Sequence, residues 1–351
     1  KTAFECNYED IKEVSPGHAL IIDKQGNYEH KQFLEPQKKK ACSFERIYFS
    51  RGTDPDIYRE RKELGRLMVP QVLKSINFDL KNTVFSYIPN TAEISFLGMM
   101  SGVEDYLISK RKEIIIEHKP SADSLEDLLT FKPRIEKLVL KDAKLRTFIA
   151  DASHRDELVA HVYDTTFEVI QKDRDSLVII DDSIVRGTTL EKSILTLLDN
   201  LNPKKIVIIS SAPQIRFPDC YGIDMSKMND FVAFRAVLAL LIDEGKEYLL
   251  EDVLEKCLAD QNKVNEVNYV KELYAPFSYD QVSQKIGEIV KPKKMKAVLE
   301  VVFQTVEGLH KACPDHLGDW YFTGDYPTKG GNSVVNMAFI NFMKGVEVRA
   351  Y

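Results

Sequence analysis

The chain of 351 residues contains few cysteines, and this scarcity excludes one broad class of protein. There are five in all, with no C-x-x-C pair and no spacing typical of a disulfide framework: Cys6, Cys42, Cys220, Cys257 and Cys313. A small secreted fold held together by disulfides is therefore excluded. The scattered set fits a reducing compartment, and we expect a cytoplasmic location.

Long hydrophobic runs and an excess of positive charge are also absent. The longest uncharged apolar run, residues 236–242, is far shorter than the roughly 20 residues that cross a bilayer. Lysine and arginine total 48 against 54 aspartate and glutamate, a net charge of −6, which argues against non-specific binding of nucleic acid. We expect neither a membrane nor a nucleic acid as partner, so a local site must hold any anionic ligand.

The composition that remains is that of an ordinary globular protein. Apolar residues make up 44% and charged residues 29%, and the length is sufficient for two domains. The chain opens KTAFECNYED, without an initiator methionine or the apolar core of a signal peptide. We interpret it as a part of a longer chain.

The clearest unit in the sequence is a βαβ pattern. Residues 177–180 form a continuous apolar run typical of a strand buried on both faces, residues 189–201 have helical spacing, and residues 206–211 form a second such strand. A further short strand is predicted over residues 83–88, ending at Pro89, with helices over 56–76 and 92–113. These elements predict an α/β fold with a parallel sheet flanked by helices.

The flanking regions differ in character from this unit. Residues 11–33 read as two or three antiparallel strands around the turns Pro16-Gly17 and Gln25-Gly26-Asn27. Amphipathic patterns predict helices over 154–172, 230–256 and 279–309. We therefore divide the chain into a β-rich part (1–40), an α/β domain (41–230) and a helical C-terminal extension that packs on that domain (231–351).

The segment DDSIVRGTT, residues 181–189, carries the candidate chemistry. Two adjacent carboxylates follow a buried strand, at the sheet edge where open α/β sheets bind ligands. Small and hydroxylated residues then lead into a helix N-terminus, where free N–H groups and the helix dipole attract phosphate. The alternatives are a capping box formed by Thr188 or Thr189 with Glu191 and a solvated acidic turn. The strand–loop–helix context favours a ligand site.

The segment VIIDDSIVRGTT resembles the phosphoribosylpyrophosphate (PRPP) signature of type I phosphoribosyltransferases. Three further segments resemble the glutamine PRPP amidotransferases, also called amidophosphoribosyltransferases: ACSFERIYFSR at 41–51, SAPQIRFPDCYGIDM at 211–225 and YFTGDYPTKGG at 321–331. The likeness is strong in patches from 41 to 224, weak from 231 to about 315, and returns near the end. It implies a type I phosphoribosyltransferase fold and the synthase portion of such an enzyme. Residues 1–40 would be a remnant of the N-terminal glutaminase domain.

The resemblance also implies roles for individual residues. Asp181 and Asp182 would engage the ribose hydroxyls and, with Thr91, help hold Mg²⁺. The 5′-phosphate would lie in the loop formed by Ser183, Ile184, Val185, Arg186, Gly187, Thr188 and Thr189. Contacts to pyrophosphate or nucleotide phosphate would come from Arg146, Arg155 and Arg216. The alternative for Thr91 is a helix cap, and that for each arginine is a surface ion pair.

The reaction implied is the first committed step of de novo purine synthesis. Ammonia, normally derived from glutamine, displaces magnesium-bound pyrophosphate from PRPP and gives 5-phosphoribosylamine, a step that needs no side-chain nucleophile. Cys6 is inside the chain and has no free α-amino group to act as base, so we expect ammonia-dependent activity only. Residues 143–145 and Asn90 depart from the family pattern, which indicates a different closure over the ligand.

Some members of the family hold an iron–sulfur cluster on four cysteines. Cys42 and Cys220 match two of these positions, whereas Gly318 and Tyr321 stand at the other two. We expect no iron–sulfur cluster, and we expect both cysteines to be buried and reduced.

Two other functions compete with this interpretation. The first is a regulatory protein that binds PRPP or a nucleotide without catalysis, against which the acidic charge and the lack of a basic DNA-reading helix count. The second is another base-specific phosphoribosyltransferase, which the segments at 211–225 and 321–331 do not support. We also expect a homo-oligomer, with purine nucleotides as candidate inhibitors.

Overall fold

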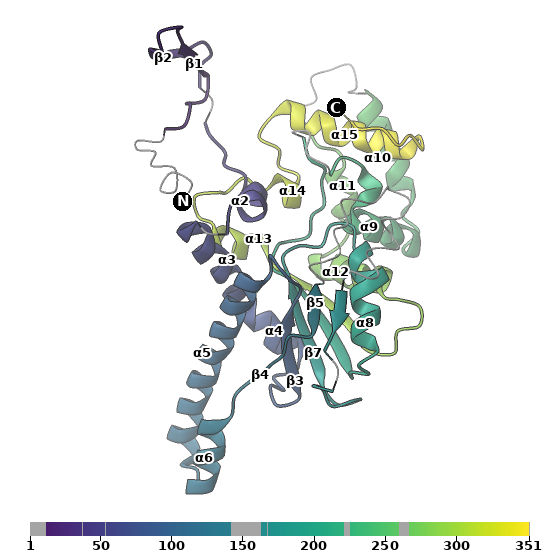
Figure 1. Ribbon diagram of the computed structural model, residues 1–351. Helices are drawn as coiled ribbons and strands as arrows, with labels where there is room; N and C mark the ends of the chain where they lie inside the picture. Colours follow the sequence, from purple (N-terminus) through teal and green to yellow (C-terminus); the bar gives the residue numbers. More distant parts are fainter. Residues whose placement is uncertain are drawn as a thin grey trace.

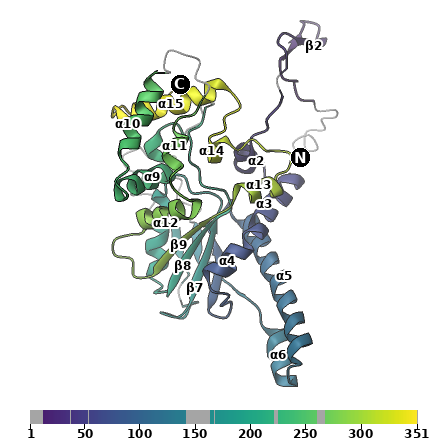
Figure 2. The ribbon, with the colours of Figure 1, turned by 180° about the vertical axis from the view of Figure 1, so that it is seen from behind.

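The centre of the molecule is a parallel sheet of five strands in the order β4-β3-β7-β8-β9 (Figures 1 and 2). The computed structural model describes residues 12–36, 38–52, 54–141, 163–166, 168–220, 225–259 and 267–350. The strands of this sheet are β3 (Thr83–Tyr87), β4 (Arg134–Ile135), β7 (Ser176–Asp181), β8 (Lys205–Ser210) and β9 (Val298–Phe303). The predicted α/β fold with a parallel sheet is confirmed.

The two middle strands are buried on both faces, which explains their unbroken apolar sequence. In β7, Leu177 and Ile179 point into one hydrophobic cluster, while Val178 and Ile180 point into another on the opposite face. All four are fully buried. Because successive side chains of a strand point to opposite faces, a strand covered on both sides needs an apolar residue at every position.

One face of the sheet is covered by α4 (Val69–Ser75) and α5 (Glu93–His118), and α3 (Pro55–Leu67) packs against α5. The predicted helices over 56–76 and 92–113 are confirmed, but the first divides at Met68, where Pro70 starts a new helix. The far half of α5 projects beyond the sheet and carries α6 (Ala122–Thr130) near its end (Figure 1).

The predicted βαβ unit is present, with an irregular helix between its strands. After β7 the chain forms one π-helical turn, Leu190–Ile194, and continues as α8 (Leu195–Asp199) before entering β8. The opposite face of the sheet is covered by α8 together with α9 (Val232–Asp243) and α12 (Tyr279–Val290). The carboxyl end of β7 therefore opens directly into a helix start.

The C-terminal region contains several helices and also one strand, β9, that the sequence did not predict. Its remaining helices are the 3₁₀ turn Met228–Asp230, α10 (Tyr248–Ala259), α11 (Lys271–Tyr274), α13 (Val306–Ala312), α14 (Trp320–Thr323) and α15 (Lys329–Met343). The helix expected over 279–309 is wrong beyond Val290, because residues 298–303 form β9 and pair with β8. The region expected to be a helical extension thus supplies an edge strand of the sheet.

A second prediction is corrected at β6 (Tyr163–Thr165). The sequence predicted a helix over 154–172, of which residues 154–162 and 167 lie outside the described part. Tyr163–Thr165 instead pairs antiparallel with β5 (Val139–Lys141). Glu168 and Asp173 have φ angles of 64° and 56°, which a continuous right-handed helix cannot include.

The N-terminal part forms the antiparallel pair that the sequence predicted. Strands β1 (His18–Ile22) and β2 (Tyr28–Gln32) make a hairpin that stands apart from the sheet (Figure 1). The chain then reaches α2 (Ser43–Phe49). Among the helices in the described ranges, none combines the length and the apolar composition needed to cross a bilayer.

Candidate functional site

A cleft of about 570 Å³ lies at the carboxyl ends of β3 and β7. The chain leaves β3 toward β4 on one side, whereas β7 continues to β8 on the other, so the strand order changes direction here. This is the position at which open parallel sheets bind ligands. The residues lining the cleft are Phe44, Tyr48, Phe49, Ile88–Thr91, Lys141, Tyr163, Asp181–Leu190, Ile194 and Met225.

The carboxylate pair lies at the mouth of β7. Asp181 is the last residue of the strand, and the backbone N–H of Asp182 donates to its Oδ1 over 2.9 Å. The N–H of Ser211, after β8, donates to the Asp181 carbonyl at 2.9 Å, which ties the two strand ends together. Burial raises the pKa of Asp181 well above its usual range, and the neighbouring Asp182 charge adds to this effect. Such a pair can accept hydroxyl hydrogen bonds or a cation.

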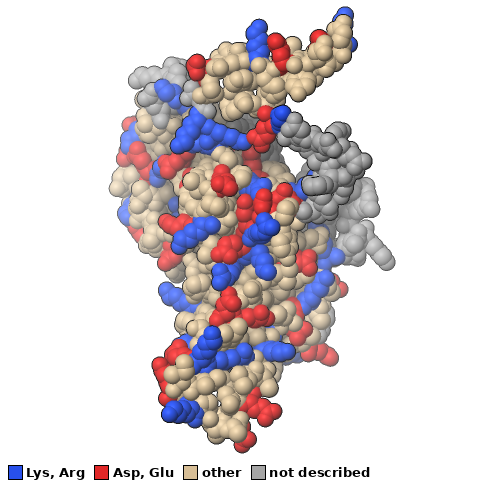
Figure 3. All heavy atoms as spheres, turned by 90° about the vertical axis from the view of Figure 1, so that its left-hand side faces the viewer, with Lys and Arg blue, Asp and Glu red and all other residues tan. Residues whose placement is uncertain are grey.

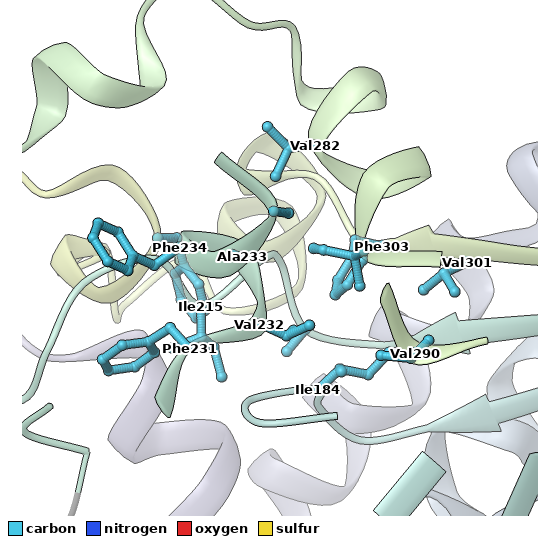
Figure 4. Packing of buried hydrophobic residues seen from close by; sticks show 14 of the residues in the cluster. Ile184, Ile215, Phe231, Val232, Ala233, Phe234, Val282, Val290, Val301 and Phe303 are labelled. Atoms are coloured by element: carbon cyan, nitrogen blue, oxygen red, sulfur yellow. The ribbon is translucent and has the colours of Figure 1, made fainter. Parts of the chain in front are cut away.

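The loop after the pair is held rigidly from behind. The side chain of Ile184 is buried among Val232, Val290 and other core residues (Figure 4), so only its backbone can face a ligand. The N–H of Val232 donates to the Val185 carbonyl at 2.8 Å. Gly187 has a φ of +73°, and a Cβ there would lie 2.7 Å from Cγ1 of Val290, so glycine is required.

Arg186 is directed toward α9 by its own interactions. Its guanidinium pairs with Asp230 at 3.0 Å, and its carbonyl accepts from Arg235 at 2.5 Å. These contacts anchor the loop to the helices beneath it. Of the predicted phosphate-loop residues, Arg186 therefore contributes an ion pair that fixes the loop.

Two threonines of the cleft, Thr91 and Thr189, are not used as helix caps. Thr189 precedes the helix but makes no side-chain capping hydrogen bond, and the residue before α5 is Ala92 and not Thr91. The simple capping alternative therefore does not describe either threonine. Thr91, Thr188 and Thr189 all line the cleft.

An aromatic wall faces the loop and was not assigned to the site from the sequence. Phe44 and Tyr48 of α2 stack with centroids 5.3 Å apart, and Phe49 lies edge-on to Tyr48 at 5.0 Å. The ACSFERIYFSR segment contains these residues, but nothing local in it indicates that α2 reaches the strand ends. Long-range packing brings it there.

Arg61 of α3 fixes the end of that wall and was also missed. Its side chain is 7% exposed, and it donates to the Ile47 carbonyl at 3.1 and 2.7 Å and to the Ser50 carbonyl at 2.9 Å. Burial lowers the pKa of Arg61, while the charge of Asp182 raises it. A buried cation thus holds α2 close to the carboxylate pair.

Tyr163 and Lys141 complete the cleft from the small β5–β6 sheet, and no sequence pattern indicated either residue. Burial raises the pKa of Tyr163, and the charges of Asp181 and Asp182 raise it further. The phenol therefore remains protonated at neutral pH and can donate a hydrogen bond.

Of the three predicted phosphate-binding arginines, Arg216 is the one within the described residues, and it does not line this cleft. Its guanidinium lies 5.2 and 4.9 Å from the ring centroids of Tyr274 and Tyr279 and donates to Gln214 Oε1 at 3.0 and 2.7 Å. Burial lowers the pKa of Arg216. Arg146 and Arg155 lie outside the described part.

The cysteines near α2 do not fit a four-thiolate cluster. Cys42 is buried and accepts from the Glu45 N–H at 3.4 Å, and burial raises its pKa to about 12. Cys220, expected to be buried, is half-buried. The backbone of Gly318 forms a parallel β-bridge with that of Cys42. A Cβ at position 318 would lie 2.6 Å from the Ala41 carbonyl oxygen. Within the described ranges, no three His, Cys, Asp or Glu side chains form a metal-binding group.

The chain is similar in sequence to curated amidophosphoribosyltransferases. It is 28% identical over 316 residues to that of Lachancea kluyveri, covering 84% of this chain and 55% of the relative. The Escherichia coli protein is 25% identical over 233 residues, covering 64% of this chain and 40% of its own length. No family model matches the chain. The chain spans about half the length of the first relative and less of the second.

Solved structures show the same fold. Glutamine PRPP amidotransferase from B. subtilis, complexed with ADP and GMP, matches 91% of this chain and 53% of its own with a TM-score of 0.52 and 22% identity. A structure described as the allosteric regulatory enzyme of purine biosynthesis matches with a TM-score of 0.54, again at 22% identity. The resemblance stated from the sequence motifs is confirmed: the chain is a homologue of the amidophosphoribosyltransferases and has the fold of part of a PRPP amidotransferase.

Proposed function

We propose that this chain transfers the phosphoribosyl group of PRPP to ammonia, giving 5-phosphoribosylamine and pyrophosphate. One observation carries the proposal: the cleft between β3 and β7 joins a carboxylate pair to a rigid loop that leads into a helix N-terminus. PRPP presents a ribose diol next to phosphate groups. The carboxylates suit the diol, and the backbone N–H groups of the loop suit the 5′-phosphate.

Magnesium is the metal that the side chains of the cleft fit. Asp181, Asp182 and Thr91 offer hard oxygen donors. Burial, and then the charge of Asp182, raises the pKa of Asp181, and a cation would offset both effects. Mg²⁺ commonly takes one or two protein carboxylates and completes its shell with substrate oxygens and water. When bound, it would neutralise charge on the departing pyrophosphate.

The residues of the chain then have to orient the substrate and keep water from the anomeric carbon. The ammonia nitrogen forms a bond to the anomeric carbon. At the same time, the bond between this carbon and a pyrophosphate oxygen breaks, and the nitrogen releases a proton. The aromatic wall formed by Phe44, Tyr48 and Phe49 faces the loop and limits the access of water, which would compete as nucleophile. No side chain forms a covalent intermediate.

The remaining assignments extend this proposal. We assign Arg146 and Arg155 to contacts with pyrophosphate or nucleotide phosphate, whereas Arg216, held by Gln214 and two tyrosines away from the cleft lining, is not assigned to such a contact. Purine nucleotides are proposed inhibitors, supported by the ADP and GMP complex of the B. subtilis relative. We also propose that the chain forms a homo-oligomer and that it is located in the cytoplasm.

The test measures pyrophosphate release from PRPP and Mg²⁺ with ammonium, with glutamine at equal concentration, and with no amine. For the 351-residue chain, we expect release with ammonium and background release in the other two reactions. PRPP binding by calorimetry without release under any condition would favour the non-catalytic regulatory function. Glutamine-dependent release would refute the expected nitrogen donor.

A further inference from the structure

Helix α5 has a long exposed side with apolar residues. Ile108, Ile115 and Ile116 are 48%, 37% and 74% exposed, and Leu97 near the base of the helix is 46% exposed. The helix projects past the sheet (Figure 1), so its far half is not covered by the sheet. Four exposed apolar side chains on one helix mark a surface suited to a protein partner.

Most of these residues share one stripe. Leu97, Ser101, Glu104, Ile108 and Ile115 are spaced by four, three, four and seven residues, which places them along one face of an α-helix. In the half of α5 next to the sheet, the other faces are occupied. α3 approaches closely at Gly98, where a Cβ would lie 1.7 Å from the Lys62 carbonyl oxygen, and α4 at Gly102, where a Cβ would lie 2.7 Å from Val69 Cγ2. The opposite side buries Phe96 and Val103.

We propose that this stripe binds the same stripe of a second copy of the chain, with the two helices antiparallel and centred on Ile108. A two-fold axis at Ile108 pairs positions at equal distances on either side of it. Glu104 then opposes Lys112 of the partner subunit, four residues from the centre. Ser101 opposes the partner's Ile115, seven residues from it, so a small side chain faces a large one.

The charges favour a second copy over another partner. Figure 3 views the molecule from the side on which α5 lies and shows acidic and basic side chains interspersed over this face, so a partner of one charge sign would meet repulsion. Neighbouring charges on α5 are already used within the chain: Asp105 pairs with Arg66 at 3.1 Å and Lys110 with Glu113 at 2.7 Å. Across the part of the chain that the structure describes, Glu104 and Lys112 form no ion pair.

The proposal is tested by sedimentation velocity on the 351-residue chain across a range of concentrations. We expect the parent to approach twice its 40.2 kDa mass as concentration rises. Glu104→Lys and Lys112→Glu each create two like-charge pairs across the axis, and each is expected to weaken association about tenfold. Lys81→Glu, an exposed charge change elsewhere, is the matched control and is expected to leave the association unchanged.

Mixing the two weakened variants gives the sharper test. In a mixed dimer, position 104 of each subunit again faces an opposite charge at position 112 of the other, so we expect the mixture to associate better than either variant alone. In the double variant Glu104→Lys/Lys112→Glu both pairs carry opposite charges again, and we expect it to associate about as well as the parent. A monomeric parent would overturn the proposal. So would single variants that associate normally, or a mixture that remains as weak as its components. The proposal specifies an interface for the homo-oligomer proposed above, and because mass is measured and not turnover, the outcome is independent of the proposed phosphoribosyl transfer.

Discussion

The two sides of the cleft are built in different ways. The loop side, Asp181–Thr189, is contiguous in sequence and carries its carboxylates and hydroxyls at the start of a helix. The α2 side is assembled from distant segments, with Phe44 and Tyr48 held in place by Arg61 of the next helix. The loop side supplies groups that can touch a substrate, whereas the α2 side supplies shape and exclusion of water. Substitutions in the loop should therefore lower turnover, and substitutions of residues that anchor α2 should lower the free energy of unfolding and admit water to the cleft.

The largest effect is expected on the loop side, from Asp182→Asn. The substitution keeps the shape but removes one charge from the pair, and loss of one such electrostatic contact typically lowers turnover by about 10²–10³-fold. Steady-state pyrophosphate release with ammonium measures it. Asp173→Asn, an exposed carboxylate before the other end of β7, is the control and should keep parental activity. Equal turnover in both variants would remove Asp182 from the site.

The next effect is expected on the α2 side, from Arg61→Met. The change removes three hydrogen bonds to the carbonyls of Ile47 and Ser50, and we expect a loss of about 3 kcal/mol in the free energy of unfolding. The loosened wall should also increase PRPP hydrolysis in the absence of amine. Arg59→Met, whose side chain is 73% exposed, should cost less than about 0.5 kcal/mol. An Arg61 variant with parental stability and parental hydrolysis would contradict the anchoring role.

A smaller effect is expected from Gly187→Ala. Both a φ of +73° and a Cβ 2.7 Å from Val290 Cγ1 oppose alanine, so the free energy of unfolding should fall by about 2 kcal/mol and PRPP binding should weaken. Gly245 is the matched control. It has a φ of +62° and open space within 4 Å of the point that a Cβ would occupy, so Gly245→Ala should show only the backbone strain, about 1 kcal/mol. Denaturant titration of both variants separates steric contact from strain.

The smallest effect is expected from the pH dependence of Asp181. Because its folded pKa is raised, the folded protein holds that proton to higher pH than the unfolded chain does. The group therefore stabilises the fold below its unfolded pKa and loses this contribution as pH rises through the folded value. Asp181→Asn should raise the Tm of the ligand-free protein by about 1–3 °C at pH 8, with the gain vanishing near pH 4. A gain that grows as pH falls would reverse the sign of the argument.

Local sequence patterns determined the centre of the fold and half of the cleft. The continuous apolar runs of β7 and β8 could belong only to buried elements of strand length, and the carboxylates and hydroxyls of 181–189 follow one another along the chain. Strand burial and helix starts depend on neighbouring residues, which is why one sequence was sufficient to predict them.

The tertiary structure decided everything that depends on contacts between distant residues. Residues 298–303 were predicted as helix, yet they pair with β8, because a short apolar segment takes the conformation that its neighbour in space requires. Phe44, Tyr163 and Arg61 reach the cleft or its wall only through packing across many residues, and Arg216 is held by two tyrosines that come from a different region. The sequence by itself specified the βαβ unit and its carboxylate loop. Only the fold could bring α2, β6 and β9 to them, since no local pattern encodes which distant surfaces will meet.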